Sequence, residues 1–311
     1  MTRKITADDI RKAVNDAYNE YKNLDKGAID PRLAGTADAD RLGITVMLVD
    51  GTTINKGDTD VKAPLGDIAN LVVHTVLLEQ NGPRKMLKLA GKVCPAEVRH
   101  LDLPMSAHAI RAYSAIEPRD DADGKYNLIM DMLLDMTEGN PDLDDNLYKF
   151  LVKETADADE ENKLAAVEYT VYDNISNVMN GYARLEALRV NTEQLATIGA
   201  TIAADGKNPV TGNTAFDNDI SAAVTTFAAY NGRTDKLRRY MMRAGAPSVF
   251  SFSGLVIALM PGVGAIAVYG PKVGKHGRSK QGKRIVQYIT EAIGYNIFAS
   301  TPLEVVQPVN V

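Results

Sequence analysis

The first twenty residues place apolar side chains on one helical face. Thr6 stands just before this segment and can accept a hydrogen bond from the first turn, as helix-capping residues do. The apolar positions recur at a spacing of about 3.6 residues and are Ile10, Ala13, Val14, Ala17 and Tyr18. The chain is therefore predicted to begin with an amphipathic helix.

Two hairpins are predicted near opposite ends of the chain. The stretch 42–58 is rich in β-branched residues before Asp50-Gly51, a dipeptide typical of tight turns. The stretch 254–269 has two apolar runs around Pro261-Gly262 and predicts a second hairpin. Strand pairs at both ends of the chain are expected to meet in one antiparallel sheet.

Helical patterns fill the space between the hairpins and follow the second one. An apolar helix is predicted for 66–81, stopped by Asn81-Gly82-Pro83. Residues 120–217 show helical periodicity and no convincing strand, and the acidic run 154–163 within them is interpreted as a helix start with a solvated face. Further helices are predicted for 218–230, 235–243 and 279–293, the last ending at Gly294.

This order predicts an α/β (α+β layered) fold, in which an antiparallel sheet is flanked by helices and carries an inserted all-helical domain. The sheet domain is expected to combine residues 1–118 and 218–311, and the helical domain to comprise 119–217. The length of 311 residues suits one large domain or two closely packed ones.

Composition narrows the classes of function. The net charge of −5 argues against a dedicated nucleic-acid binder. Cys94 is the single cysteine, so no internal disulfide can form and a reducing compartment is expected. The N-terminus lacks a signal-peptide pattern, and the chain lacks 18 consecutive apolar residues. A cytoplasmic protein that does not act in a membrane is the expectation.

Several strings resemble one family. They are 40–61 around the first hairpin, 191–212, and 254–272 with 277–300 around the second hairpin and last helix. In these strings the chain is similar to the serine-dependent glutaminases, which share the β-lactamase/transpeptidase-like fold of the serine β-lactamases and penicillin-binding proteins. The resemblance implies acyl transfer, in which a serine attacks the side-chain amide of glutamine, a lysine takes the serine proton, and ammonia leaves.

The family's serine and lysine are replaced in this chain. A Ser-x-x-Lys pair lies on one helical face, so that the amine reaches the hydroxyl. In the segment 60–78, which matches by resemblance, Asp67 stands at the serine position and Asn70 at the lysine position. Because an amide cannot accept a proton at neutral pH, the hydrolytic dyad is predicted to be absent.

Other family positions near the nucleophile are also substituted. By resemblance, Ser106 and His108 fall at the asparagine and glycine of an Asn-Ala-Gly-Ala-Ile string, and Thr234 falls at a tyrosine near the nucleophile. The far-wall strand, Lys-Ser-Gly in the family, reads Val249-Phe250-Ser251 here.

Three further positions are expected on the substrate side. Asn162 and Tyr182 match substrate-contacting residues, and the substrate glutamate matches either Glu154 or Thr155. Alternatives stay open for two of them, because Asn162 can simply cap a helix and Tyr182 can be a core residue with its hydroxyl bonded.

A replacement chemistry is also considered. Asp67 and His108 can form a new acid/base dyad if they converge, whereas His108 can instead fill space vacated by substrate. His74 lies in an apolar run and is interpreted as a core residue. No metal-ligand spacing and no phosphate-binding loop is recognised, so no cofactor is expected.

Three hypotheses for function follow. The first is a non-hydrolytic homologue that binds a small amino-acid-like ligand or a partner. The second is a repurposed enzyme that acts on a glutamine- or glutamyl-type substrate through Asp67 and His108. The third is a glutamine amidohydrolase. The resemblance also implies a homo-dimer or tetramer.

Overall fold

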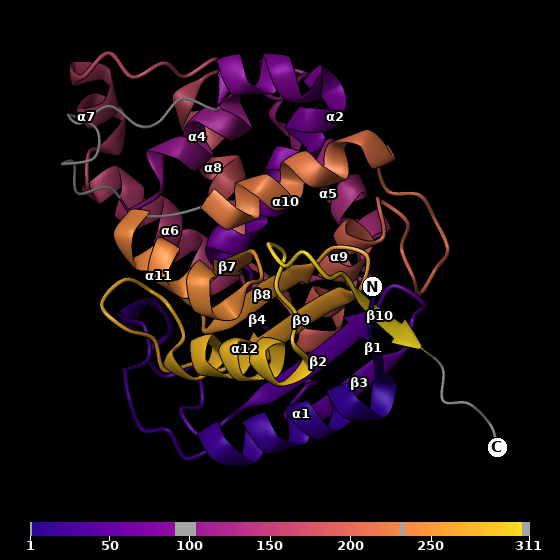
Figure 1. The fold of residues 1–311 in the computed structure, drawn as a ribbon. Helices are drawn as coiled ribbons and strands as arrows, with labels where there is room; N and C mark the ends of the chain where they lie inside the picture. Colours follow the sequence, from indigo (N-terminus) through magenta and orange to yellow (C-terminus); the bar gives the residue numbers. More distant parts are fainter. Residues whose placement is uncertain (1, 91–103, 231–233, 307–311) are drawn as a thin grey trace.

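A five-stranded antiparallel sheet forms the centre of the lower half of the molecule in Figure 1. The structure is a computed structural model that describes residues 2–90, 104–230 and 234–306, the side chains of 234–238 excepted. The strands lie in the order β3 (Thr53–Gly57), β2 (Gly43–Leu48), β9 (Gly264–Tyr269), β8 (Leu255–Met260) and β7 (Ser248–Phe250). Both predicted hairpins are confirmed, and β2 pairs with β9, so segments from both ends of the chain build one sheet.

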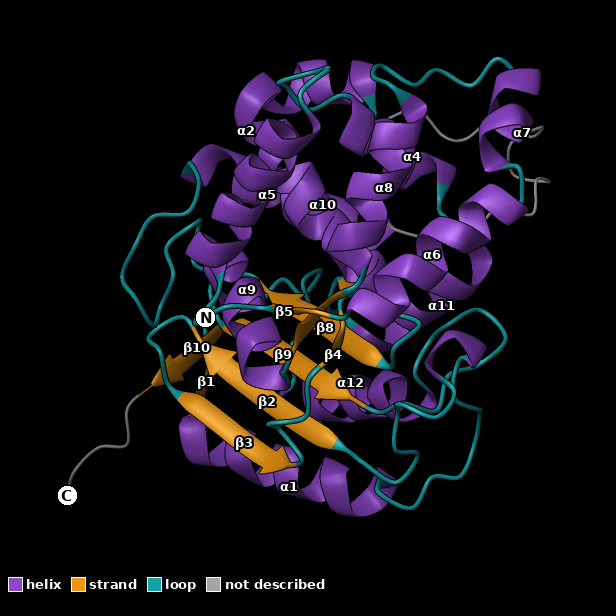
Figure 2. Ribbon diagram, turned by 180° about the vertical axis from the view of Figure 1, so that it is seen from behind, coloured by secondary structure: helices purple, strands orange, loops and turns teal. Residues whose placement is uncertain are grey.

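The two faces of the sheet pack against different helices. Alternate strand residues divide between two apolar clusters, since side chains in a strand alternate with period two: Val46 and Val268 belong to one, Met47 and Ala267 to the other. Helices α1 (Ala7–Tyr21) and α12 (Lys280–Ile293) cover the first face. Helix α9 (Thr192–Ala203) covers the second, as Figure 2 shows from behind.

A glycine allows α9 to approach the sheet closely. A Cβ at Gly199 would lie 2.5 Å from the Cβ of Ala265 in β9. Any larger residue at this position would push the helix away from the strands. Helix α9 therefore lies directly on the sheet, although it falls within the range 119–217. The division of the chain into two domains stays a prediction.

The predicted start of the first helix and the predicted end of the last one are confirmed. Thr6 caps α1 in a reciprocal arrangement with Asp9, in which each side chain accepts from the other's backbone N–H. Ser279 caps α12 through the backbone N–H of Gly282, and Gly294 ends this helix in the left-handed conformation with φ of 67°. Local signals therefore set these boundaries of α1 and α12.

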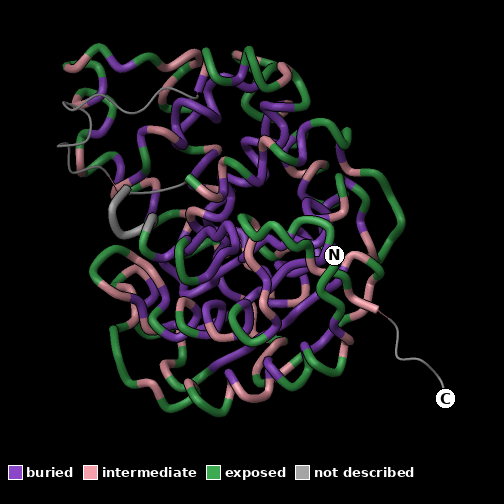
Figure 3. Tube along the Cα trace, in the orientation of Figure 1, coloured by how far each residue is buried: buried purple, intermediate pink, exposed green. Residues whose placement is uncertain are grey.

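The remaining helices lie mostly in the upper half of the molecule in Figure 1, but one of them, α11 (Thr234–Ala244), packs against α12 beside the sheet. They are α2 (Ala69–Leu89), α4 (Ala107–Ser114), α5 (Ala122–Met136), α6 (Asp145–Asp157), α7 (Glu160–Ala166), α8 (Ile175–Glu186), α10 (Ser221–Tyr230) and α11 (Thr234–Ala244), with short 3₁₀ turns at Pro31–Leu33 (η1), Gly66–Ile68 (η2) and Asn218–Ile220 (η3). The first half of α2 is buried on every side (Figure 3). Gly82, with φ of 66°, breaks α2 where a stop was predicted, and helical residues resume after it.

The prediction that 120–217 contains no strand is wrong. Strands β5 (Asp142–Leu143) and β6 (Leu188–Val190) pair with β4 (Ala63–Pro64) in a small antiparallel sheet of order β4-β6-β5. Runs of two or three residues are too short to show a period of two, so the pattern could not reveal them. This small sheet fixes the chain immediately before η2 and immediately after α8.

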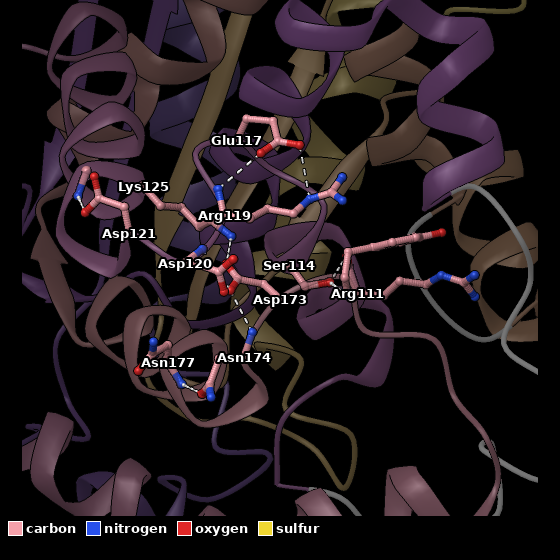
Figure 4. A network of polar contacts seen from close by, with 12 residues as sticks. Arg111, Ser114, Glu117, Arg119, Asp120, Asp121, Lys125, Asp173, Asn174 and Asn177 are labelled. Atoms are coloured by element: carbon pink, nitrogen blue, oxygen red, sulfur yellow. Dashed lines mark hydrogen bonds and ion pairs between the residues drawn. The ribbon is translucent and has the colours of Figure 1, made fainter.

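A buried ion pair joins α5 to the segment before α8. Lys125 and Asp173 are 1% and 4% exposed and contact each other directly. The carboxylate of Asp173 also accepts hydrogen bonds from the backbone N–H groups of Asn174, at 2.6 Å, and Asp120, at 3.2 Å (Figure 4). Both charges of the Lys125–Asp173 pair are therefore compensated, as buried charges require.

The two ends of the described chain lie side by side. Strand β1 (Arg3–Thr6) pairs in parallel with β10 (Leu303–Val306), with Arg3 opposite Leu303. No helix in the part of the chain that the structure describes combines the length and the apolar character needed to cross a membrane.

Candidate functional site

The start of α2 is held in place by a tight turn between β4 and η2. The Leu65 N–H donates to the carbonyl of Leu188 at 2.8 Å, which ties the turn to β6. Gly66 has φ of 51°, and a Cβ there would lie 2.5 Å from Ser251 Oγ and 2.7 Å from the ring of Phe252. The turn therefore requires glycine, and it carries Asp67 and Asn70 to one side of the helix start.

Asp67 is enclosed by protein yet keeps accessible surface. Burial raises the pKa of its carboxyl, and the charges of Arg32 and Arg278 oppose this shift. A carboxyl that is surrounded on most sides but still reached by water suits the floor of a binding site.

Glu186, the last residue of α8, is a second buried carboxyl in the same place and is 4% exposed. Burial, followed by the charge of Asp67, raises its pKa well above the ordinary value. The periodicity did not single out this residue. One signal was available, since Glu186 lies four positions after Tyr182 and therefore on the same helical face.

Arg32 carries a positive charge that acts on both carboxyls. Its guanidinium is already bonded to Asp30, with Nε at 2.8 Å from Oδ1 and Nη2 at 3.0 Å from Oδ2. The guanidinium carbon also lies 3.7 Å from the centroid of the Phe252 ring. Arg32 thus acts on Asp67 and Glu186 through space while its hydrogen bonds go to Asp30.

Tyr182 and Asn70 face these carboxyls. Both are buried, and neither the Tyr182 hydroxyl nor Asn70 Oδ1 has a hydrogen-bond partner among the described residues. Burial, and then the charges of Glu186 and Asp67, raises the pKa of Tyr182. The Asn70 side chain lies close enough to the Tyr182 hydroxyl to lower this pKa in turn, so Tyr182 is a buried tyrosine beside Asn70, and its contact with a substrate stays a prediction.

Glu154 and Thr155, the two alternatives for one substrate position, differ in their bonding. The Thr155 hydroxyl donates to the carbonyl of Val152 in its own helix at 2.8 Å. Glu154 Oε2 is buried without a hydrogen-bond partner in the described part of the chain. Glu154 is the one with an acceptor available for a ligand.

Glu160 begins α7 and is fully buried, although it lies in the acidic run interpreted as a solvated face. Burial raises its pKa to about 7, and the Met105 N–H donates to its Oε2 at 3.4 Å. Its Oε1 has no partner among the described residues. By contrast, Asn162 is exposed and donates to Asp159 at the start of the same helix, at 2.7 Å.

His108 lies against a different set of side chains. Its ring centroid is 5.2 Å from that of His74, and Phe227 stacks on His74 at 3.5 Å. His74 Nδ1 donates to the carbonyl of Asn70 at 2.7 Å, Nε2 has no partner among the described residues, and burial lowers the pKa to about 3. Burial and Arg111 lower the pKa of His108. The dyad of Asp67 with His108 stays a prediction.

The remaining predicted positions are spread out. Ser251 is buried and donates to the carbonyl of Pro64 at 3.3 Å, which supports the turn before Asp67. Ser106 is exposed and precedes α4 without capping it through its side chain. Thr234 begins α11, and its side chain lies outside the described residues, as does Cys94.

Two hollows on the surface occur elsewhere. One of about 560 Å³ lies between α11 and α12 and is lined by residues that include Arg243, Arg284 and Tyr288. The other, of about 480 Å³, lies beside the first hairpin and Glu193. Asp67 lines neither hollow. The start of α2 is therefore identified as the candidate site by the chemistry of its side chains, and not by the volume of a hollow.

The arrangement of sheet and helices defines a serine β-lactamase-like fold of the kind seen in glutaminase structures. A solved structure described as a probable glutaminase superposes with a TM-score of 0.84 at 22% identity, covering 95% of this chain and 100% of its own. A probable glutaminase from Bacillus subtilis, complexed with 6-diazo-5-oxo-L-norleucine, gives a TM-score of 0.76 at 19% identity, covering 94% of each chain.

The sequence places the chain within that class. A sequence model of the Glutaminase family matches residues 29–298, so the chain belongs to the glutaminase family. The glutaminase of Bacteroides thetaiotaomicron is 28% identical, with 98% of this chain and 100% of the relative covered. The resemblance found in the sequence strings is thereby confirmed at the level of family and fold.

Proposed function

We propose that this chain binds a glutamine- or glutamate-like amino acid at the start of α2 and does not hydrolyse it by the family's serine mechanism. The carrying observation is the pair Asp67 and Asn70, one helical turn apart, where the resemblance puts serine and lysine. A hydroxyl nucleophile and an amine base are both missing from these positions.

The surroundings of Asp67 do not make it a substitute nucleophile. Burial raises its pKa, so the carboxyl keeps its proton to higher pH than an ordinary aspartate, and a neutral carboxyl attacks an amide poorly. Asn70 cannot take up a proton at neutral pH. Phe250, in place of a far-wall hydroxyl by resemblance, supplies no polar group.

Ligand binding is supported by polar atoms that have no partner in the described part of the chain. The Tyr182 hydroxyl can donate to a carboxylate, and Glu154 Oε2 can accept from an ammonium group. An amino acid offers both groups, and the Bacillus subtilis relative is complexed with the amino acid 6-diazo-5-oxo-L-norleucine. We extend this ligand class to the present chain, together with a homo-dimer or tetramer and a cytoplasmic location.

Hydrolysis of glutamine to glutamate and ammonia is the second candidate. Relatives matched over nearly their full length are named glutaminase, and this naming favours hydrolysis more directly than it favours a loss of activity. Hydrolysis requires that a chain with Asp67 and Asn70 at these positions still turns over glutamine, whereas the first candidate requires that it does not.

Ammonia release from L-glutamine by the purified chain distinguishes the candidates. We expect no release above a protein-free blank, and we expect glutamine or glutamate at about 100 times its dissociation constant to stabilise the fold by about 2.7 kcal/mol. Turnover by the wild-type chain would overturn the proposal, and its loss in Asp67→Ala would assign the reaction to this site. Turnover that survives Asp67→Ala would show that the catalytic positions lie elsewhere.

A further inference from the structure

The hollow of about 560 Å³ between α11 and α12 is separate from the start of α2, since Asp67 does not line it. Two arginines line it, Arg243 in the last turn of α11 and Arg284 near the start of α12. Glu291 is the only acidic side chain among the described residues that line it. The volume falls within the range of about 300–1,000 Å³ that small-molecule sites occupy, so the hollow is large enough for a small ligand.

More basic side chains gather beside this hollow. Lys283 and Arg284 follow Lys280 by three and four positions, so all three lie on one side of α12. The ammonium nitrogen of Lys283 lies 5.9 Å from the centroid of the Tyr240 ring in α11. Tyr240 stands three positions before Arg243 and shares its side of α11. Basic side chains of α12 therefore lie against the end of α11 that carries Arg243.

Arg278, just before α12, joins this group through an aromatic pair. The rings of Tyr240 and Phe250 pack edge to face with their centroids 5.3 Å apart. The guanidinium carbon of Arg278 lies 5.6 Å from the Phe250 centroid, and Lys283 lies on the Tyr240 ring. Burial, and then the charges of the other four cations, lower the pKa of Lys283. The five cations form what we call the basic cluster: Arg243, Arg278, Lys280, Lys283 and Arg284.

No carboxylate neutralises the basic cluster within the described part of the chain. None of its members has an ion pair within 4.0 Å there, whereas Arg41 elsewhere pairs with both Asp58, at 2.7 Å, and Asp38, at 3.1 Å. The first turn of α12 contains no acidic residue, although a helix N-terminus favours negative charge and disfavours cations. The chain as a whole carries a net charge of −5, so the cluster reverses that sign locally. A bound anion would offset this repulsion.

The side chains at the hollow favour phosphate groups as that anion. The guanidinium groups of Arg243 and Arg284 can each bind phosphate oxygens through two parallel hydrogen bonds, and several linked phosphates can offset several cations together. Tyr21 and Tyr288 also line the hollow, with ring centroids 6.2 Å apart, and offer aromatic surface on which a nucleotide base can stack. Glu291 follows Arg284 by seven positions, about 10 Å along α12, so the phosphates are expected at the arginine end.

We propose that the hollow between α11 and α12 binds a ligand that carries a diphosphate or triphosphate group, and that the basic cluster holds its phosphates. This is a second ligand site, and it does not depend on the function proposed for the start of α2. Inorganic pyrophosphate and a nucleoside diphosphate share the required chemistry. They differ in the base that Tyr21 and Tyr288 would contact.

Isothermal titration of the full chain with pyrophosphate, ADP and adenosine tests the proposal. We expect pyrophosphate and ADP to bind and adenosine not to bind. Because the attraction is electrostatic, the affinity for pyrophosphate should fall roughly tenfold between about 0.05 M and about 0.5 M NaCl. Tighter binding of ADP than of pyrophosphate would assign the hollow to a nucleotide, and equal binding would assign it to an inorganic polyphosphate.

Substitutions in the hollow locate the binding. Arg243 and Arg284 are exposed, so Arg243→Gln and Arg284→Gln should each leave the fold intact and weaken pyrophosphate binding roughly fivefold. Glu291→Gln removes the acid from the hollow and should strengthen binding. Arg84→Gln is the matched control, because Arg84 is an exposed arginine in α2 without an ion pair among the described residues.

Four outcomes would overturn the proposal. The first is that neither pyrophosphate nor ADP binds at the lower salt concentration. The second is that adenosine binds as tightly as ADP. The third is that both arginine variants in the hollow keep the wild-type affinity for pyrophosphate. The fourth is that Arg84→Gln weakens binding as much as they do, because the attraction would then be spread over the whole surface.

Discussion

Two groups of buried charge in the helical half of the molecule are organised in opposite ways. In the first, Asp173 has Lys125 and two backbone N–H groups as partners (Figure 4). In the second, Asp67 and Glu186 have no bonded cation among the described residues, and Glu160 has one bare oxygen. Both groups are enclosed by helices, so burial alone does not explain the difference.

Both Asp173 and Glu186 are desolvated, but their pKa values shift in opposite directions. Burial raises the pKa of Asp173, but the bonds from Lys125, Asn174 and Asp120 outweigh it and hold the pKa below its ordinary value. For Glu186, burial and the charge of Asp67 act together and raise the pKa. A charge kept for the fold is thus fully partnered, and the unpartnered group is where a ligand can supply what is missing.

The largest expected effect comes from removing one charge of the Lys125–Asp173 ion pair. Lys125→Met removes the cation and leaves Asp173 as an uncompensated buried charge, so the free energy of unfolding should fall by about 3–5 kcal/mol. Urea denaturation measures this loss. The double variant with Asp173→Asn is the control, because it removes both charges and should recover part of the stability. A loss below about 1 kcal/mol would remove the contrast between the two groups.

A smaller effect is expected from pH at Glu160. The pKa is about 7 in the folded chain against about 4.5 when unfolded, so the folded state binds more protons between these values. Its contribution to stability is therefore full below pH 4.5 and is lost as pH rises to 7, by about 3 kcal/mol.

Glu160→Gln isolates this contribution. The difference in free energy of unfolding between wild type and variant should shrink or reverse steadily as pH rises from 4.5 to 7, which denaturation at several pH values measures. A difference that is constant over this range would mean that Glu160 titrates normally in the folded chain.

The smallest expected effect comes from replacing the carboxyl of Asp67, which has no bonded cation among the described residues. Because burial raises the pKa of Asp67, its ionised form is disfavoured in the fold, and Asp67→Asn should stabilise the chain by about 1 kcal/mol at pH 8. Asp173→Asn is the matched variant and should destabilise it. If the two aspartates gave changes of the same sign in urea denaturation, the comparison would fail.

Features of the fold set by neighbouring residues were predictable from the sequence. Thr6 caps the start of α1 and Gly294 ends α12, as expected, and both hairpins form at their turn signals. The β4-β6-β5 sheet was missed because its strands are too short to show a pattern.

The candidate site was only half predictable. Asp67 and Asn70 stand in one short string, so the resemblance found them. Arg32 and Glu160 come from separate parts of the chain, and their charges reach Glu186 only because of tertiary packing. Glu160 in particular lies in an acidic run that reads as solvated, because sequence pattern does not say which member of such a run is turned inward.

The pairing of β2 with β9 has a consequence for biosynthesis. Residues 43–48 leave the ribosome long before residues 264–269, by about 10–40 s at ordinary elongation rates. Until then, one edge of β2 has no neighbour, and α12 is still missing from one face of the sheet. Most helices of the upper half are synthesised before residues 264–269, so closure of the sheet has to wait for the last part of the chain.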